Sequence, residues 1–146
     1  MSPRTQPKRW AASEILHAIA RELGRPRPGG IGLACPEEIT NLTRTGKRPV
    51  AVRIPYPVHH LRRWMDILDT VDTVLVGAGP IGGDPHITVI GRLPRGPQIE
   101  LACWAYDLTL DDLGITSGLR QSENRPITAE QLRATDDATR TRRSTR

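Results

Sequence analysis

Hydrophobic residues recur at helical spacing in two parts of the chain. Between residues 10 and 23 the apolar side chains lie three or four positions apart, and Gly24 follows as a suitable helix end. A second amphipathic helix is predicted over residues 58–68, where His59, Arg62 and Arg63 point away from the apolar stripe. The stripe consists of Val58, Leu61, Trp64, Met65 and Leu68.

Four other segments have the alternation or the β-branched residues that predict strands, namely 50–54, 73–78, 86–93 and 98–106. A Pro-Arg-Gly-Pro segment between the last two is a suitable hairpin turn. Pro36 and the two glutamates after it predict the start of a short helix that ends at Gly46. A helix followed by the order β-α-β-β-β favours an α+β fold with a three- to four-stranded, mostly antiparallel sheet.

The chain has 146 residues and 37% apolar content, enough for one modest core. We expect a disordered leader over 1–9, a single α+β domain over 10–113 and a polar, largely disordered basic tail over 114–146. Within that tail, Thr128 and Gln131 can form a capping box for a short helix.

No long uncharged apolar run is present, so we predict no membrane span, and the polar, basic start does not resemble a signal peptide. The expected location is the cytoplasm. The two cysteines, Cys35 and Cys103, have no partner at metal-ligand spacing, which favours two reduced, buried thiols over a disulfide or a reactive site.

Residues 77–82 read Gly-Ala-Gly-Pro-Ile-Gly, a formal match to the glycine motif of dinucleotide-binding folds. That motif binds a pyrophosphate because it leads into a helix whose free N–H groups point at the phosphate. Here the motif leads through Pro85 into residues 86–90, a β-branched run that favours a strand. We therefore predict a glycine loop between two strands, and no bound cofactor.

His86 and Thr88 match one half of the paired H-x-T signature of the two-histidine phosphoesterases, in which two imidazoles act as acid and base. A second copy is missing, because no Thr or Ser follows two positions after His17, His59 or His60. His86 is therefore either a catalytic residue of a small hydrolase, acting with Thr88, or a strand residue with no catalytic role. Adjacent histidines point about 100° apart on a helix, so His59 and His60 do not predict a metal site.

The predicted hairpin has two distinct faces. The core face takes Ile87, Val89, Ile99, Leu101, Cys103 and Ala105 in any pairing that keeps the alternation. The opposite face carries His86, Trp104 and Tyr106, which form a candidate surface for contact with a partner if no helix covers them. The alternative is that the helix from Trp10 or the C-terminal segment covers this face.

The net charge of +5 is unevenly spread, since residues 71–118 sum to −4 and the excess of arginine lies elsewhere. Phosphate groups of a nucleic acid can be neutralised by such residues. A role in keeping the chain ends soluble explains these arginines equally well. The chain also has only five Phe, Trp or Tyr residues, which are few for a platform that stacks several bases. The candidates for nucleic-acid contact are Arg62, Arg63, Arg140, Arg142, Arg143 and Arg146.

The segment PHITVIGRLPRGPQIELACWAYD, residues 85–107, follows the helical segment VHHLRRWMDIL, residues 58–68. A helix with a tryptophan, then a hairpin that ends in Trp-Ala-Tyr, resembles small proteins of high-G+C actinobacteria and of their plasmids and phages. The likeness covers residues 50–107 and carries no catalytic motif.

Within that group, the size and composition resemble the plasmid-spread proteins of streptomycete conjugative plasmids. The resemblance implies an accessory role in moving plasmid DNA within the mycelium. Several such proteins are associated with membranes, whereas this chain has no predicted span. The resemblance, together with the charge layout, implies a non-enzymatic accessory protein that contacts other proteins, transfer proteins among them, and makes weak non-specific contacts with DNA. A small DNA-binding regulator is a further alternative.

Overall fold

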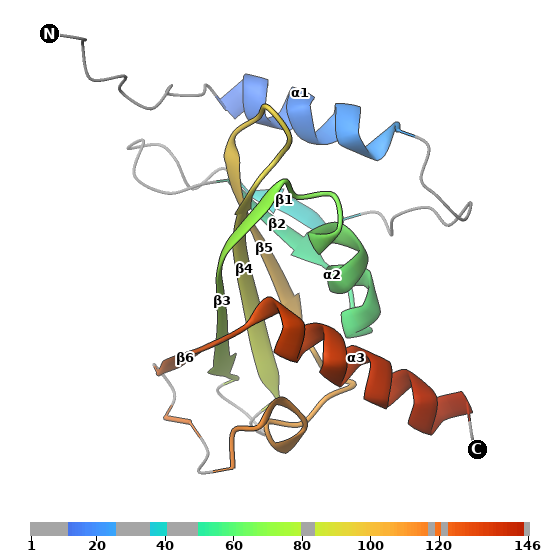
Figure 1. Cartoon of the computed structure of the whole chain (residues 1–146). Coiled ribbons are helices and arrows are strands. Elements are labelled where there is room, and N and C mark those ends of the chain that lie inside the picture. Colours follow the sequence, from blue (N-terminus) through green and yellow to red (C-terminus); the bar gives the residue numbers. More distant parts are fainter. Residues whose placement is uncertain are drawn as a thin grey trace, which may run out of the picture.

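The protein has an α+β fold, in which helices pack on a six-stranded mixed sheet (Figure 1). The strands lie in the order β1-β2-β5-β4-β3-β6. No helix among the described residues is long and apolar enough to cross a membrane. This computed structural model describes residues 12–25, 36–40, 50–79, 84–116, 119–120 and 123–144.

The four predicted strands form the middle of the sheet. They are β2 (Val50–Ile54), β3 (Thr70–Ala78), β4 (Pro85–Arg92) and β5 (Gln98–Trp104). Strands β3, β4 and β5 form an antiparallel meander, as expected, whereas β2 pairs with β5 in parallel. Helix α2 (Val58–Met65) connects β2 to β3 and packs against β5.

Two further strands, which the sequence pattern did not reveal, extend the sheet at both edges. Strand β1 (Glu38–Thr40) pairs with β2, and β6 (Asn124–Ile127) pairs with β3. The prediction of a three- to four-stranded sheet was therefore too small. The short helix predicted after Pro36 is wrong, because the open edge of β2 offers backbone partners to this segment: the Glu37 N–H donates to the carbonyl of Arg53 (2.8 Å).

The segment expected to be a largely disordered tail contains β6 and a long helix, α3 (Ala129–Ser144). The hydroxyl of Thr128 accepts from the Gln131 N–H (3.0 Å), so the predicted helix start is confirmed. The Gln131 side chain does not return to the cap, and it donates to the Leu113 carbonyl at the end of the short 3-10 helix η2, Asp111–Leu113 (3.2 Å). Contacts of this kind tie the segment to the domain. The predicted leader, 1–9, lies outside the described residues.

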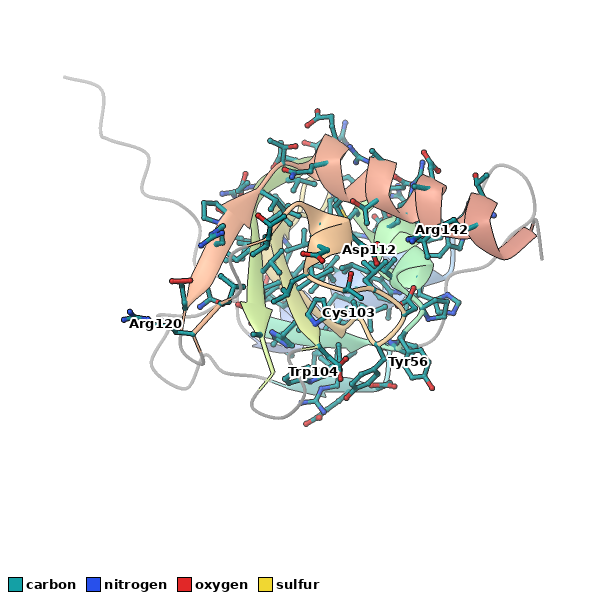
Figure 2. The ribbon with its side chains drawn as sticks, turned by 90° about the horizontal axis from the view of Figure 1, so that it is seen from below. Tyr56, Cys103, Trp104, Asp112, Arg120 and Arg142 are labelled. Atoms are coloured by element: carbon teal, nitrogen blue, oxygen red, sulfur yellow. The ribbon has the colours of Figure 1, made fainter. Side chains whose placement is uncertain are left out.

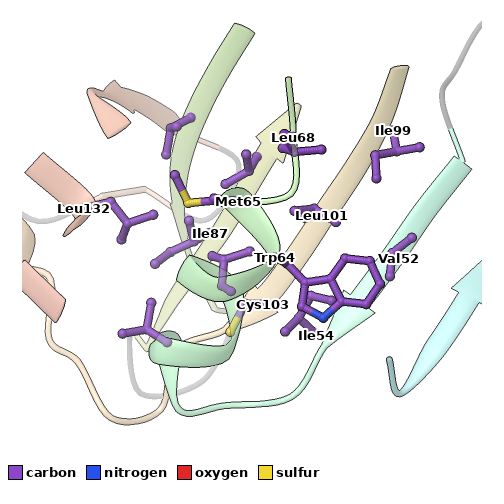
Figure 3. Close-up of a cluster of buried hydrophobic side chains, with 14 of the residues drawn as sticks. Val52, Ile54, Trp64, Met65, Leu68, Ile87, Ile99, Leu101, Cys103 and Leu132 are labelled. Atoms are coloured by element: carbon purple, nitrogen blue, oxygen red, sulfur yellow. The ribbon is translucent and has the colours of Figure 1, made fainter. Parts of the chain in front are cut away.

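The predicted core face of the hairpin is confirmed. In the register of β4 and β5, Ile87 pairs with Cys103 and Val89 with Leu101, and all four side chains are fully buried. Trp64 of α2 and Leu132 of α3 are both fully buried, and they lie on opposite sides of the cluster with Met65 between them (Figure 3). The helix predicted over 10–23 is observed as α1, Ala12–Leu23, and it lies at the end of the sheet where β4 turns into β5 (Figure 1).

Candidate functional site

The glycine motif has a structural role that explains two of its glycines. The chain leaves β3 and enters β4 at Pro85 as extended backbone, so no helix begins there. A Cβ at position 77 would lie 2.7 Å from the amide oxygen of Asn124, and one at position 79 would lie 2.9 Å from Cζ3 of Trp104. Gly77 and Gly79 thus make room for a neighbouring strand and for an indole ring. Residues 80–83 of the motif lie outside the described part.

No described helix covers the face of the sheet opposite the core, which we call the open face. Along β4 and β5 the side chains alternate between buried on the core face and partly exposed on the other face. Helix α3 lies with α2 on the core side, and Ile15, Ala18 and Ile19 of α1 belong to the same core cluster. The described parts of α1 and α3 therefore do not cover the open face, which was the alternative to a contact surface.

Four aromatic rings gather on this open face, near the start of β4 and the end of β5. His86 and Trp104 are direct cross-strand neighbours, with ring centroids 4.4 Å apart. The Trp104 and Tyr106 rings lie 6.4 Å apart and within 10° of parallel, and Tyr106 meets Tyr56 edge to face at 5.3 Å. We call Tyr56, His86, Trp104 and Tyr106 the aromatic surface. Figure 2 shows Trp104 and Tyr56 on the side of the molecule away from Arg142 of α3.

Three of these rings were predicted to form a contact surface, and the structure brings those three together. The sequence pattern missed Tyr56, because it follows β2, a strand distant in sequence from the hairpin. Strands β2 and β5 run parallel with Ile54 beside Cys103. Two residues beyond Ile54 and three beyond Cys103, the chain places Tyr56 and Tyr106 in contact. Only the parallel pairing of β2 with β5 reveals this neighbour.

The aromatic surface rests on a rigid support. The Ala105 N–H donates to the Pro85 carbonyl (2.9 Å), which holds the end of β5 against β4. Below the rings, Cys103 is fully buried, and burial together with the charges of Asp107 and Glu37 raises the pKa of its thiol to about 12. This thiol is a core side chain and not a nucleophile at neutral pH. Cys35 lies outside the described residues.

The two tyrosines are among the most exposed large apolar side chains of the described chain, at 56% for Tyr56 and 55% for Tyr106. His86 is more enclosed, and its desolvation, with a smaller contribution from the charge of Arg53, lowers its pKa below the ordinary value of 6.5. The imidazole is therefore neutral at pH 7 and behaves as a further flat ring of the surface.

A cluster of hydrogen-bonded polar side chains joins α2 to α3. The carboxylate of Asp136, whose side chain is 2% exposed, lies 3.1 Å from Nδ1 of His59 and accepts from Nη1 of Arg62 (3.1 Å). The same guanidinium also bonds Asp137, and hydrogen bonding to Asp137 is the main cause of a raised pKa of Arg62. His59 thus belongs to a contact that attaches α3 to the domain.

The predicted nucleic-acid contacts are placed as follows. Arg62 is bound by two carboxylates, and Nη2 of Arg142 donates to the carboxylate of Asp112 (3.0 Å). Arg63 lies on α2 and Arg140 on α3. The side chain of Arg143 and the whole of Arg146 lie outside the described part of the chain. Arg62 and Arg142 are therefore already paired with acidic groups of the protein itself.

Among the described residues, no group of three or more His, Cys, Asp or Glu side chains could hold a metal ion. No protein-family model matches the chain, and comparison with curated proteins and with solved structures gives no significant match. The candidate site is therefore argued from its own geometry.

Proposed function

We propose that this protein is a non-enzymatic accessory protein that binds a protein partner through the aromatic surface. The observation that carries the proposal is the exposure of Tyr56 and Tyr106, each more than half exposed, beside the near-parallel rings of Trp104 and Tyr106 on an open sheet face. Exposed aromatic groups of this kind are typical of contact sites, and Tyr and Trp are enriched among residues that dominate binding energy.

The aromatic surface has the rigidity that favours binding. His86 and Trp104 sit on the paired strands β4 and β5, and Tyr56 and Tyr106 lie two residues beyond the ends of β2 and β5. Each ring contacts at least one of the others in the free protein. Side chains that are already ordered lose less conformational entropy when a partner binds. A partner that covers the two tyrosines therefore gains the burial of apolar area at a small ordering cost.

Two observations favour binding over hydrolysis by His86 and Thr88. His86 lies against the indole ring of Trp104, and desolvation lowers its pKa, which disfavours the protonated form that an acid catalyst needs. The other histidines of the described chain lie on helices, His17 on α1 and the adjacent pair on α2. The arrangement does not offer a second imidazole on a neighbouring strand.

The biological setting of the proposal comes from the resemblance to plasmid-spread proteins. In that setting the protein acts during conjugative transfer and contacts other transfer proteins. Its partner is recruited through the aromatic surface, and any contact with DNA is made elsewhere on the chain.

The test is recovery of partners from mycelial extracts of a streptomycete that carries a conjugative plasmid. The tagged wild type is compared with a Tyr56→Ala, Tyr106→Ala double variant. Leu16→Ala is the matched control, because Leu16 is 40% exposed and lies on α1, away from the sheet face. We expect the double variant to lose partners that the wild type and the control retain, with or without nuclease. Equal recovery by all three proteins would overturn the proposal.

A further inference from the structure

Helix α3 is attached to the domain with little apolar burial. Among its described side chains, the buried ones are Leu132, Thr135, Asp136 and Thr139, and Leu132 is the one large apolar residue of the four. The Thr135 hydroxyl lies 2.9 Å from the Gln131 carbonyl, and the Thr139 hydroxyl donates to the Thr135 carbonyl over the same distance. Both hydroxyls therefore keep a hydrogen-bond partner within the helix when it leaves the domain. In apolar terms, detachment of α3 exposes one large side chain.

Charged contacts attach the same helix to α2 and η2. Arg62 of α2 donates to Asp136 (3.1 Å) and also binds Asp137, and Arg142 of α3 donates to Asp112 of η2 (3.0 Å). When the two partners of an ion pair separate, both regain water, and this hydration offsets much of the attraction that is lost. Separation of the whole helix thus differs from deletion of one carboxylate, which leaves its charged partner behind in the folded protein. These contacts suit a helix that attaches and detaches.

The attached helix occupies two arginines that the sequence predicts for nucleic-acid contact, Arg62 and Arg142. Carboxylates and phosphates bind a guanidinium in the same forked geometry, so they compete for it. Arg63 follows Arg62 in the last turn of α2, and Arg140 precedes Arg142 on α3. Release of α3 makes Arg62 and Arg142 available to phosphates, each near a second arginine in the chain.

A nucleic-acid backbone fits the released arginines better than a membrane surface does. A helix that binds at a membrane surface needs an apolar face in addition to its basic residues. Helix α3 does not have such a face, because Leu132 is its one large apolar residue. The phosphates of DNA, in contrast, require only cations along their path.

We propose that α3 is an autoinhibitory helix, whose carboxylates Asp136 and Asp137 keep Arg62 from a DNA backbone until the helix detaches. DNA binding and attachment of α3 exclude each other at Arg62, so DNA draws the protein toward the detached state. The fraction of protein with α3 attached weakens the apparent affinity for DNA. This role goes beyond the proposed function, since α3 lies on the core side of the sheet and the aromatic surface on the open face.

The test measures binding of full-length proteins to a short fluorescent DNA duplex of random sequence by anisotropy. The variant Asp136→Asn, Asp137→Asn favours the detached state. The matched control, Asp111→Asn with Glu130→Gln, removes the same charge from exposed positions on η2 and α3 and keeps the ion pairs of α3. Vesicles of phosphatidylglycerol are the membrane arm.

We expect the Asp136→Asn, Asp137→Asn variant to bind the duplex about 5- to 150-fold more tightly than the wild type, the usual range of coupling between two sites. The control changes the net charge equally and should gain much less. Addition of Arg62→Gln to the variant should cancel most of the gain. Hydrogen exchange tests the wild type without substitution: amides of α3 should lose protection when the duplex is bound, while amides of β4 keep it.

Equal affinities of the variant and the control would overturn the proposal, because charge alone would then explain the gain. Unchanged or increased protection of α3 in the DNA complex would overturn it too. The same holds for tighter binding to the vesicles than to the duplex, and for absence of duplex binding by all three proteins. None of these results touches the proposed function, which is decided by partner recovery with the Tyr56 and Tyr106 variant.

Discussion

The contact of Asp136 with α2 gives the sharpest test of how the C-terminal helix is held. Asp136 is 2% exposed and accepts from Arg62, and its carboxylate also lies 3.1 Å from Nδ1 of His59. Its neighbour Asp137 binds the same guanidinium but is 63% exposed. The variants Asp136→Ala and Asp137→Ala therefore remove one carboxylate each from the same helix and the same arginine, at opposite levels of burial.

The expected magnitudes follow from burial. A hydrogen bond to a charged group contributes about 1.5–3 kcal/mol, and breaking a buried ion pair costs about 3–5 kcal/mol when the remaining charge stays buried. Here the remaining side chains of His59 and Arg62 are 25% and 23% exposed and can regain water, and Arg62 keeps Asp137. We therefore expect Asp136→Ala to lower the free energy of unfolding by about 2–3 kcal/mol. An exposed pair contributes about 0–1 kcal/mol, which is the expectation for Asp137→Ala.

Urea unfolding followed by circular dichroism measures both free energies, provided that the dependence on denaturant is the same in the two variants. Hydrogen exchange adds a local measurement, because amides of α3 should lose protection in Asp136→Ala more than amides of β4 do. Equal destabilisation by the two variants would refute the reasoning, since burial would then have no influence. A neutral Asp136→Ala would show that this contact does not hold α3.

Three further outcomes are expected. In Gly79→Ala the new Cβ lies 2.9 Å from the Trp104 ring, so the free energy of unfolding should fall by about 1–3 kcal/mol. A lower melting temperature and a change in indole fluorescence would report it. In a Cys35→Ser background, Cys103 should resist a thiol reagent until the protein unfolds. Because its folded pKa is about 12 against an ordinary 9.0, stability should stay level below pH 9 and fall between these values. The folded pKa of His86 is lowered below 6.5, so the neutral imidazole should contribute stability above pH 6.5. This contribution should be lost as the pH falls through the folded pKa. The His86→Phe variant should lack this pH dependence.

The pairing of β2 with β5 shows how topology creates the candidate site. His86, Trp104 and Tyr106 come from one hairpin, so alternation along two neighbouring strands was enough to place them on one face. Tyr56 joins them because the crossover through α2 returns the chain so that β2 lies parallel to β5. The four-ring surface is therefore a property of the sheet and not of the hairpin.

Local periodicity by itself determined the two amphipathic helices, the four central strands, the buried hairpin face and the strand after the glycine motif. These features depend on which side chains neighbour one another along the chain, and residues two, three or four positions apart report that directly. The motif at 77–82 belongs with them, because the β-branched run after Pro85 is a local signal for a strand.

Tertiary structure alone decided the two edge strands, the length and packing of helix α3 beyond its predicted start, and the place of Tyr56. The buried positions of α3 have helical spacing, but Leu132 is the one large apolar residue among them, and the others are Thr135, Asp136 and Thr139. Their partners, the Asp112 carbonyl for Thr135 and the α2 side chains for Asp136, lie far away in the sequence. A hydrophobic pattern cannot show burial that is satisfied by hydrogen bonds, because those bonds exist only after the partners have been brought together.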